Sequence, residues 1–233
     1  MNAIEVQRLS YTYPDGTKAI RDLNLRIERN KRVAILGANG SGKTTLLYHL
    51  NGLILPQEGQ VRVFGEEVSK KNLKAIRQKV GVLFDNPDNQ LFSSSVFNDI
   101  AFGPRNLGLD EEIVLERVQK VMELVNINDL KDKAPYNLSL GQKKRVAIAG
   151  ILAMEPFLIL LDEPFSGLDP RSHKHFFNIL NDLFVKGTTQ VISTHDVDMA
   201  YSWADEVVIL DEGKILASKT AVEAKNLLLG SSV

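Results

Sequence analysis

Hydrophobic and polar residues alternate with two different periods along this chain, and the two periods predict where strands and helices lie. Leu23, Leu25 and Ile27 alternate with polar residues, which is typical of a strand with one buried face. Other runs are short and nearly continuous in apolar residues: 32–36, 158–162, 189–193 and 206–210. Such runs indicate parallel strands that are covered on both faces.

A helical period follows Asp110, whose side chain suits an N-cap, and it predicts a helix over residues 110–126. The apolar stripe of this helix consists of Val114, Val118, Val121, Met122 and Val125. Helices are also expected over 172–186 and 196–203. Turn signals in YPDGT and FGEE indicate antiparallel strands in roughly the first sixty residues. The polar stretch at 85–110, which contains Pro and Gly, predicts the entry into an inserted lobe.

Composition limits the classes of partner. The chain has 233 residues, a net charge of -1 and no cysteine. A nucleic-acid-binding protein would more often show a basic excess, so we expect no nucleic-acid partner. The absence of cysteine excludes disulfides and thiolate metal sites. The N-terminus lacks the apolar run of a signal peptide, and no stretch approaches the ~20 apolar residues of a membrane span, so membrane contact must go through a partner.

The most specific motif is GANGSGKT, which begins at Gly37 and matches G-x-x-x-x-G-K-[ST] in full. It follows an apolar run and opens a helical stretch, so a glycine-rich turn without a ligand is disfavoured. Lys43 would face the β and γ phosphates of ATP, Thr44 would offer its hydroxyl to Mg²⁺, and Thr45 could donate to the α-phosphate. The candidate cradle residues are Gly37, Ala38, Asn39, Gly40, Ser41, Gly42, Lys43, Thr44 and Thr45.

Two acidic residues stand at the end of the apolar run in FLILLDEP. Adjacent carboxylates are costly to desolvate together unless they have a task. Asp162 suits the Mg²⁺ shell, through water, and Glu163 suits a general base or water-orienting group for attack on the γ-phosphate. A solvated acidic turn at a strand end is the alternative, which the phosphate motif disfavours.

Further motifs flank this acidic pair. LSLGQKKRVAIAGIL (138–152) precedes it, SGLD (166–169) follows it, and STHD contains His195. In this order the chain resembles the ATP-binding subunit of ABC transporters over essentially its whole length. PDNQLF and AFGPRNLGL resemble the ATPases of energy-coupling-factor importers, which take up cobalt, nickel or vitamins.

The resemblance implies roles for the segment that begins at Leu138. Ser139 and Gly141 are expected to touch the γ-phosphate, with Gln142 beside them, and Leu140 stands where the family usually has Gly. A serine hydroxyl, a glycine N–H and a helix N-terminus form an anion site, although the segment alone is also an ordinary helix start. A second anion site implies a second chain, packed head to tail with ATP between the two copies.

The basic run that follows, Lys143, Lys144 and Arg145, is expected to be a solvated helix face rather than a nucleic-acid patch. Asp169 lies in SGLD, which the family uses to couple the two sites of the dimer.

Aromatic and histidine residues complete the family pattern. Tyr13 stands where the family places an aromatic that stacks on adenine, and Tyr11 is the competitor. The resemblance assigns His195 a hydrogen bond to the γ-phosphate that helps hold the attacking water. The remaining histidines, His49, His173 and His175, are expected to be surface or packing residues.

Asp85 departs from the family, which places a glutamine at this strand end, close to Mg²⁺ and the attacking water. Asp85 could be a metal ligand, or it could be a turn residue that bonds local backbone with Asn86 before Pro87. Gln90 is not an obvious substitute. A calcium loop is excluded because the spacing lacks the central Gly and the terminal Glu of that motif.

These patterns predict an α/β fold: a P-loop NTPase with a RecA-like parallel core, an N-terminal antiparallel β layer and an inserted α-helical lobe. The single domain 1–233 would divide into a core with its β layer (1–85 and 156–233) and a lobe (86–155). The chain ends soon after AKNLLLGSSV, so we expect no large regulatory domain after it.

The resemblance implies a peripheral protein at the cytoplasmic face of the membrane that hydrolyses ATP with Mg²⁺. It would power the transport of cobalt, nickel or a vitamin through integral membrane subunits, as a homodimer or as a heterodimer with a related ATPase. A partner helix would dock near 85–105. The alternatives are a soluble ABC ATPase acting on DNA, ribosomes or iron–sulfur assembly, and a nucleotide-binding module without turnover.

Overall fold

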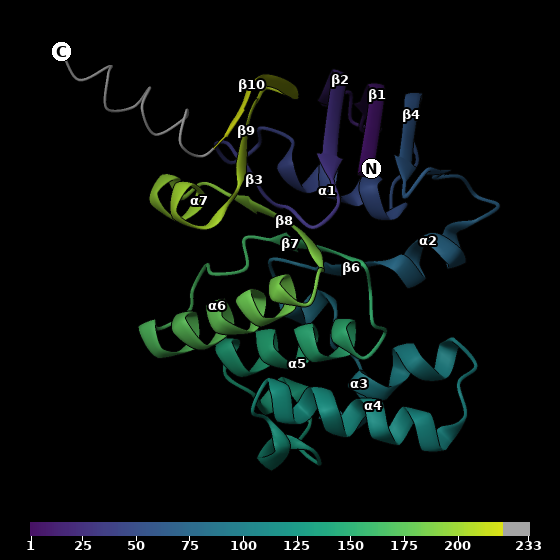
Figure 1. The fold of residues 1–233 in the computed structure, drawn as a ribbon, viewed down its shortest axis with the longest axis vertical. Coiled ribbons are helices and arrows are strands. Elements are labelled where there is room, and N and C mark those ends of the chain that lie inside the picture. The colour runs from purple at the N-terminus through teal and green to yellow at the C-terminus, as the bar shows by residue number, and fades with distance from the viewer. Residues whose placement is uncertain (221–233) are drawn as a thin grey trace.

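The computed structural model describes residues 1–220. Two sheets and a group of helices make up this part of the chain (Figure 1). No helix within it is both long and apolar enough to cross a membrane. Residues 221–233 lie outside the described residues. Two predictions fall there: that the core extends to residue 233, and that no large regulatory domain follows.

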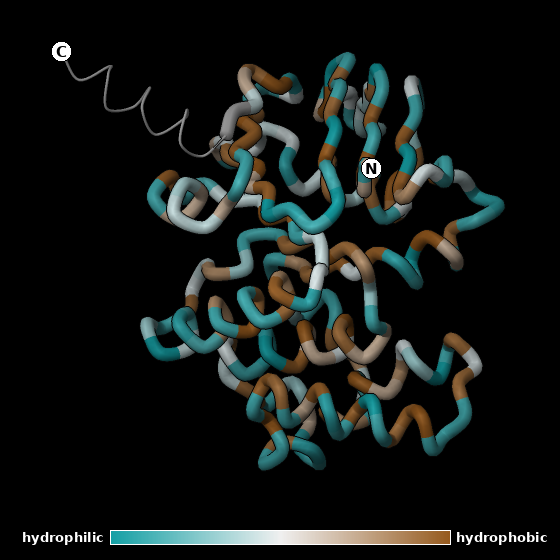
Figure 2. The backbone as a smooth tube through the Cα atoms, viewed as in Figure 1, coloured by the Kyte–Doolittle hydropathy of each residue, from teal (hydrophilic) through white to brown (hydrophobic). Residues whose placement is uncertain are grey.

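The small sheet is antiparallel, in the order β2 (Lys18–Glu28), β1 (Asn2–Thr12), β4 (Glu58–Val63) and β5 (Glu66–Glu67). Val6 of β1 pairs with Leu25 of β2, and Leu9 pairs with Leu23. Hydrophobic and hydrophilic positions alternate along these strands (Figure 2), because successive side chains of a strand point to opposite faces. The predicted half-buried strand over 23–27 is confirmed as part of β2.

The large sheet has, within residues 1–220, the order β10 (Lys214–Thr220), β9 (Glu206–Asp211), β3 (Arg32–Leu36), β8 (Thr189–Thr194), β7 (Leu158–Asp162) and β6 (Val80–Leu83). The strands from β9 to β6 run parallel, and β10 pairs antiparallel with β9. All residues of β7 and β8 are buried. The four apolar runs are therefore confirmed as parallel strands, and all of their carboxyl ends lie at one edge of the sheet.

The helices of the described residues are α1 (Lys43–Asn51), α2 (Leu73–Lys79), α3 (Val96–Asn106), α4 (Glu111–Leu124), α5 (Leu140–Leu152), α6 (Pro170–Val185) and α7 (Val197–Trp203). Short 3-10 turns occupy Pro87–Asn89, Asn128–Leu130 and Pro135–Asn137. The helices predicted over 110–126, 172–186 and 196–203 correspond to α4, α6 and α7. Helices α2 and α3 were not predicted.

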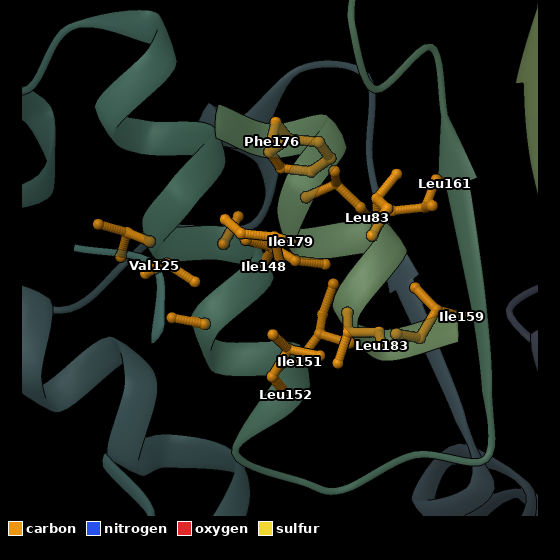
Figure 3. Close-up of a cluster of buried hydrophobic side chains, with 14 of the residues drawn as sticks. Leu83, Val125, Ile148, Ile151, Leu152, Ile159, Leu161, Phe176, Ile179 and Leu183 are labelled. Carbon is orange, nitrogen blue, oxygen red and sulfur yellow. The ribbon is translucent and has the colours of Figure 1, made fainter. Parts of the chain in front are cut away.

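The large sheet separates two hydrophobic cores. Leu158 and Leu160 of β7 pack toward α1 and the small sheet, whereas Ile159 and Leu161 pack toward the helices. On the helix side, side chains of α5 and α6 meet Ile159 and Leu161 of the sheet (Figure 3). Both faces of the parallel strands are covered, which confirms the predicted α/β class. The boundaries at 85/86 and 155/156 stay a prediction.

One prediction about α5 is wrong. Lys144 is only 1% exposed, whereas we expected it on a solvated helix face. Helix α5 lies between the large sheet and helices α3 and α4 (Figure 1), which leaves it few solvated positions. Lys143 does reach the surface, where its Nζ lies 2.6 Å from Oδ1 of Asp88. Arg145 donates to the backbone carbonyl of Asn126 at 2.8 Å.

Candidate functional site

The loop between β3 and α1 has the geometry of an anion cradle. Gly40 and Gly42 have φ values of 82° and 106°, which side chains rarely adopt. A Cβ on Gly37 would lie 2.3 Å from the carbonyl oxygen of Leu210, so the close approach also requires glycine. No side chain caps the start of α1. The free N–H groups and the positive end of the helix dipole therefore face the loop.

Lys43 lies across this loop and is 6% exposed. Its Nζ donates to the backbone carbonyl oxygens of Gly37 at 2.8 Å and Ala38 at 3.1 Å. The same Nζ lies 3.8 Å from Oε1 of Glu163. The ammonium thus stands between the cradle and the acidic end of β7, where it can neutralise a bound anion.

The end of β7 brings a hydroxyl and a carboxylate together. The Thr44 hydroxyl donates to Oδ2 of Asp162 at 2.6 Å, and the hydroxyl of Ser193, from β8, donates to Oδ1. This pair of oxygen ligands suits Mg²⁺, which binds few protein groups and keeps water or phosphate oxygens. No group of three or more His, Asp or Glu side chains within residues 1–220 is arranged to hold a metal by itself, so phosphate oxygens would complete the shell.

Glu163 is held in an unusual backbone conformation directly after β7. Its φ is 42°, in the left-handed region that non-glycine residues occupy rarely. Its N–H donates to the carbonyl oxygen of Ser193 at 3.1 Å, and its carboxylate Oε1 lies 2.9 Å from Nδ1 of His195. His195 stands just beyond β8 with an exposed side chain. A carboxylate paired with an imidazole at this point can orient a water molecule.

A hollow of about 310 Å³ joins these groups. Its lining includes Tyr13, Asn39, Lys43, Thr44, Thr45, Asp85, Asp162 and Glu163. The Tyr13 hydroxyl lies 3.0 Å from Oγ1 of Thr45, so the aromatic ring stands beside the start of α1. Tyr11 does not line this hollow and instead packs edge-on against His49, with ring centroids 5.0 Å apart. This geometry favours Tyr13 over Tyr11 as the stacking partner of a base.

The turn after β6 is closed by residues other than Asp85. Oδ1 of Asn86 accepts from the N–H of Asp88 at 2.9 Å, and Oε1 of Gln90 accepts from the N–H of Phe84 at 3.2 Å. Asp85 is exposed and lines the hollow. Its carboxylate therefore remains free to face a ligand, while Asn86 plays the turn role that we had considered for both residues.

The segment at the start of α5 forms a capping box. The Ser139 hydroxyl accepts from the N–H of Gln142 at 3.4 Å, and Oε1 of Gln142 accepts from the N–H of Ser139 at 2.9 Å. Ser139 is exposed, and Leu140 is 41% exposed. None of Ser139, Gly141 and Gln142 lines the hollow. The structure therefore does not bring this segment to the cradle of its own chain.

Gly141 packs against the start of α6, because a Cβ there would lie 2.8 Å from Oγ of Ser172. Asp169 caps α6 by accepting from the N–H groups of Arg171 and Ser172, each at 3.0 Å. Hydrogen bonds from Ser172 lower the pKa of Asp169. The SGLD turn and the LSLGQ segment thus form one surface at the ends of α5 and α6.

Two polar residues beside the site were not predicted from the sequence. Ser193 is buried in β8 and holds both Asp162 and Glu163; its signal was a serine at the end of an apolar strand, within STHD. Lys144 donates to the backbone carbonyl of Glu163. Its signal was its position four residues before Ile148, on the buried side of α5.

Comparison with known proteins identifies the family. Residues 20–166 match the family model for ABC transporters. This chain belongs to the ABC transporter family. It is an ATP-hydrolysing subunit of that family, as the resemblance of its motifs implied.

Its relatives include transporter subunits and solved cassettes. It is 48% identical to the energy-coupling factor transporter ATP-binding protein EcfA of Carboxydothermus hydrogenoformans, covering 92% of this chain and 80% of that protein. It is 50% identical to EcfA of Methanothermobacter thermautotrophicus, covering 94% and 71%. CbiO1 of Clostridium perfringens, described as part of the ABC transporter complex cbiONQ, superposes with a TM-score of 0.86 at 38% identity, covering 99% and 94%.

A dimeric ATP-binding cassette in a post-hydrolysis state, bound to ADP and Pi, also superposes with a TM-score of 0.86. It is 26% identical and the match covers 94% of this chain and 98% of that one. These matches confirm the predicted P-loop NTPase fold.

Proposed function

We propose that this ABC ATPase powers the uptake of a small substrate through integral membrane subunits, as a component of an energy-coupling-factor importer. The observation that carries the proposal is the hollow that unites Tyr13, Lys43, Asp162 and Glu163. The names of the relatives, which are transporter subunits rather than soluble ABC proteins, supply the coupling to transport. We accordingly do not favour a soluble ABC ATPase.

ATP would enter the hollow with its base against Tyr13 and its phosphates on the loop. The ring of Tyr13 stands next to Thr45, at the start of α1, so the base and the α-phosphate are held by neighbouring groups. Lys43 would exchange its bonds to the carbonyls of Gly37 and Ala38 for the β and γ phosphates. Residues 37–45 supply N–H groups that surround the phosphate chain.

Thr44 and Asp162 are the residues that would hold Mg²⁺, which neutralises charge that develops on the phosphates. Their hydrogen bond of 2.6 Å shows that the two oxygens already converge. Asp85 lines the same hollow and is a third candidate ligand, acting directly or through water. Glu163 and His195 would orient the attacking water, since their side chains meet at 2.9 Å beside the hollow.

A second copy would complete the site, either as a homodimer or with a related ATPase. Ser139, Gly141 and Gln142 do not line the hollow of their own chain, yet they form the start of a helix. In a head-to-tail dimer this helix start would face the γ-phosphate bound by the other chain. ATP would then join the two copies, and hydrolysis would separate them.

The membrane partner would dock on the turn and helix that follow Asp85. Phe92 is 66% exposed and Phe102 is 48% exposed, and their rings meet edge to face with centroids 4.7 Å apart. Adjacent exposed apolar side chains are one feature of protein interaction sites. A cytoplasmic helix seated here would report its position to the hollow through Asp85 and would place this protein at the cytoplasmic face of the membrane. The resemblance to energy-coupling-factor importers leaves cobalt, nickel and a vitamin as the candidate substrates.

The test is the variant Glu163→Gln. It keeps the cradle but removes the carboxylate that orients water, so ATP should bind without being hydrolysed and a stable dimer should accumulate in size-exclusion chromatography. Hydrolysis at the original rate would disprove the assignment of Glu163. Copurification of tagged chain with a multi-span membrane protein tests the transport role separately, and recovery of the ATPase without any membrane subunit from its native membranes would argue against it.

A further inference from the structure

A buried cation lies behind the hollow and takes no part in the mechanism above. The Lys144 side chain, from α5, donates from Nζ to the backbone carbonyl oxygens of Glu163 at 3.0 Å, Pro164 at 3.3 Å and Ser166 at 2.9 Å. An ammonium has three N–H groups, so all of them have an acceptor. Lysine is rarely buried unless such partners are present.

The electrostatic surroundings of Lys144 are acidic. Burial lowers the pKa of Lys144, and the charges of Asp85, Glu163 and Asp162 oppose this effect. These are the carboxylates that line the hollow. Lys144 is buried and does not line the hollow, so its ammonium is near these carboxylates without forming part of the wall of the hollow.

The turn that Lys144 holds is under backbone constraint. Glu163 has a φ of 42°, and a non-glycine residue stays in this conformation only when its surroundings hold it there. Two donors meet at the carbonyl oxygen of Glu163: Nζ of Lys144 at 3.0 Å and the N–H of Ser166 at 3.2 Å. In the preceding peptide group, the N–H of Glu163 donates to the backbone carbonyl and the hydroxyl of Ser193. Rotation of this backbone would carry the carboxylate away from His195.

We propose that Lys144 is a positioning residue for hydrolysis: its ammonium fixes the backbone of residues 163–166 so that the Glu163 carboxylate faces the γ-phosphate site. This inference rests on the proposed function of Glu163. Lys144 lies on α5, whose N-cap is Ser139. This helix therefore connects two parts of the proposed mechanism: the Ser139 segment, which would contact the nucleotide of the second copy, and Glu163, which would orient water in its own chain. Lys144 does not line the hollow, so it would act only through Glu163.

The first test replaces the ammonium without emptying the space. Lys144→Met retains most of the aliphatic chain but cannot donate to the three carbonyls. We expect kcat for ATP to fall roughly 10- to 100-fold, the effect of misplacing a catalytic group by about 1 Å, while KM stays within about twofold. Lys143→Met is the matched control, because Lys143 pairs with Asp88 on the surface of the same helix; its kcat should remain near the native value.

The second readout separates positioning from a merely structural role. If Lys144 acts by aiming Glu163, Lys144→Met should still close around ATP and should accumulate the dimer, as Glu163→Gln does. Loss of the ATP-dependent dimer together with weakened ATP binding would instead show that α5 had been disturbed, and it would overturn the proposal.

A double-mutant cycle shows whether Lys144 acts through Glu163. Residues that work as one unit give effects that do not add. In the Glu163→Gln background, Lys144→Met should therefore cause no further fall in the slow residual rate of hydrolysis, measured in single-turnover experiments with radiolabelled ATP. Independent, multiplying losses would overturn the inference.

The outcomes distinguish this inference from the function on which it rests. If Glu163→Gln hydrolyses ATP at the native rate, the proposed role of Glu163 fails and Lys144 has nothing to position. If Glu163→Gln stalls while Lys144→Met turns over at the native rate, only this inference fails. If the melting curve of Lys144→Met shows that it does not fold, Lys144→Gln replaces it, because the amide retains two donors. We then expect a kcat between the values of the native protein and of Glu163→Gln. A native kcat would contradict the proposal.

Discussion

The two segments that we propose to bind phosphate differ in how completely a single copy of the protein forms each of them. The cradle at residues 37–45 is packed against the ends of β3 and β7, and the side chain of Lys43 is almost fully enclosed beside Glu163. The segment at Ser139 is exposed and satisfies its own helix start through the capping box with Gln142. The cradle is preorganised for a ligand, whereas a phosphate at Ser139 must compete with bonds that the segment already makes.

This difference indicates which step each segment controls. Binding of ATP should depend on the cradle of the same chain, because its charges and N–H groups are in place before a partner arrives. Closure of the dimer should depend on the Ser139 segment, because its N–H groups gain a phosphate only across the interface. Four predictions test this division of roles, in order of decreasing effect.

The largest effect is expected from Lys43→Ala, which removes the cation from the cradle. ATP binding to the isolated chain should weaken, and turnover should fall roughly 10²- to 10³-fold, because the ammonium of Lys43 is the cation that lies within the loop, against Gly37 and Ala38. Equilibrium binding of a fluorescent ATP analogue measures the first effect, and phosphate release measures the second. Lys120→Ala, on the exposed face of α4, is the control. Unchanged binding in Lys43→Ala would contradict the preorganised cradle.

Ser139→Arg should separate binding from closure. The new side chain is bulky and lies on the exposed surface, so ATP binding to the isolated chain should stay within about twofold while turnover falls roughly 10- to 100-fold. In the Glu163→Gln background it should also prevent the ATP-bound dimer from forming, as seen by size-exclusion chromatography. If Ser139→Arg abolished ATP binding to the monomer, the cross-chain site would be in doubt.

Asp85→Gln should change how turnover depends on Mg²⁺. The carboxylate of Asp85 repels the γ-phosphate until Mg²⁺ is bound, so native turnover should rise more steeply with free Mg²⁺ than turnover of the variant. We expect the half-saturating concentration to differ by about threefold, as for a weak exposed charge interaction. Asp88→Asn, in the same turn but outside the hollow, removes a similar charge as the control. Superimposable curves would leave Asp85 without a metal-facing role.

The smallest effect is expected at His49, which lies behind the cradle and should make the stability of the protein depend on pH. Burial lowers the pKa of His49, which a hydrogen bond with the Thr45 carbonyl only partly offsets. The unfolded chain therefore takes up this proton at a higher pH than the folded chain does. The free energy of unfolding should fall as the pH drops below the ordinary value of 6.5. His49→Gln should flatten this fall in urea titrations, and His173→Gln should not; equal slopes in native and His49→Gln would contradict the prediction.

The amino-acid sequence by itself determined the elements whose residues form one uninterrupted pattern along the chain. The apolar runs at 32–36 and 158–162 became β3 and β7, because a strand buried on both faces needs no alternation. The phosphate loop was recognisable for the same reason, since Gly37 to Thr44 carry the N–H groups, the charge and the hydroxyl within one segment. Its partner Asp162 was found because two adjacent carboxylates directly follow an apolar run, which is costly unless they have a task.

Only the tertiary structure decided the properties that depend on which distant segment packs against a residue. Helix α3 contains Gly103 and Pro104, which in the sequence favour a loop. In the structure Gly103 allows close packing, because a Cβ there would lie 2.4 Å from the sulfur of Met154 on the neighbouring segment. Lys144 belongs to a basic run that looks solvated, and only the packing of α5 against the sheet buries it under Glu163. Exposure and hydrogen-bond partners arise between segments distant in sequence, so local pattern and propensity cannot specify them.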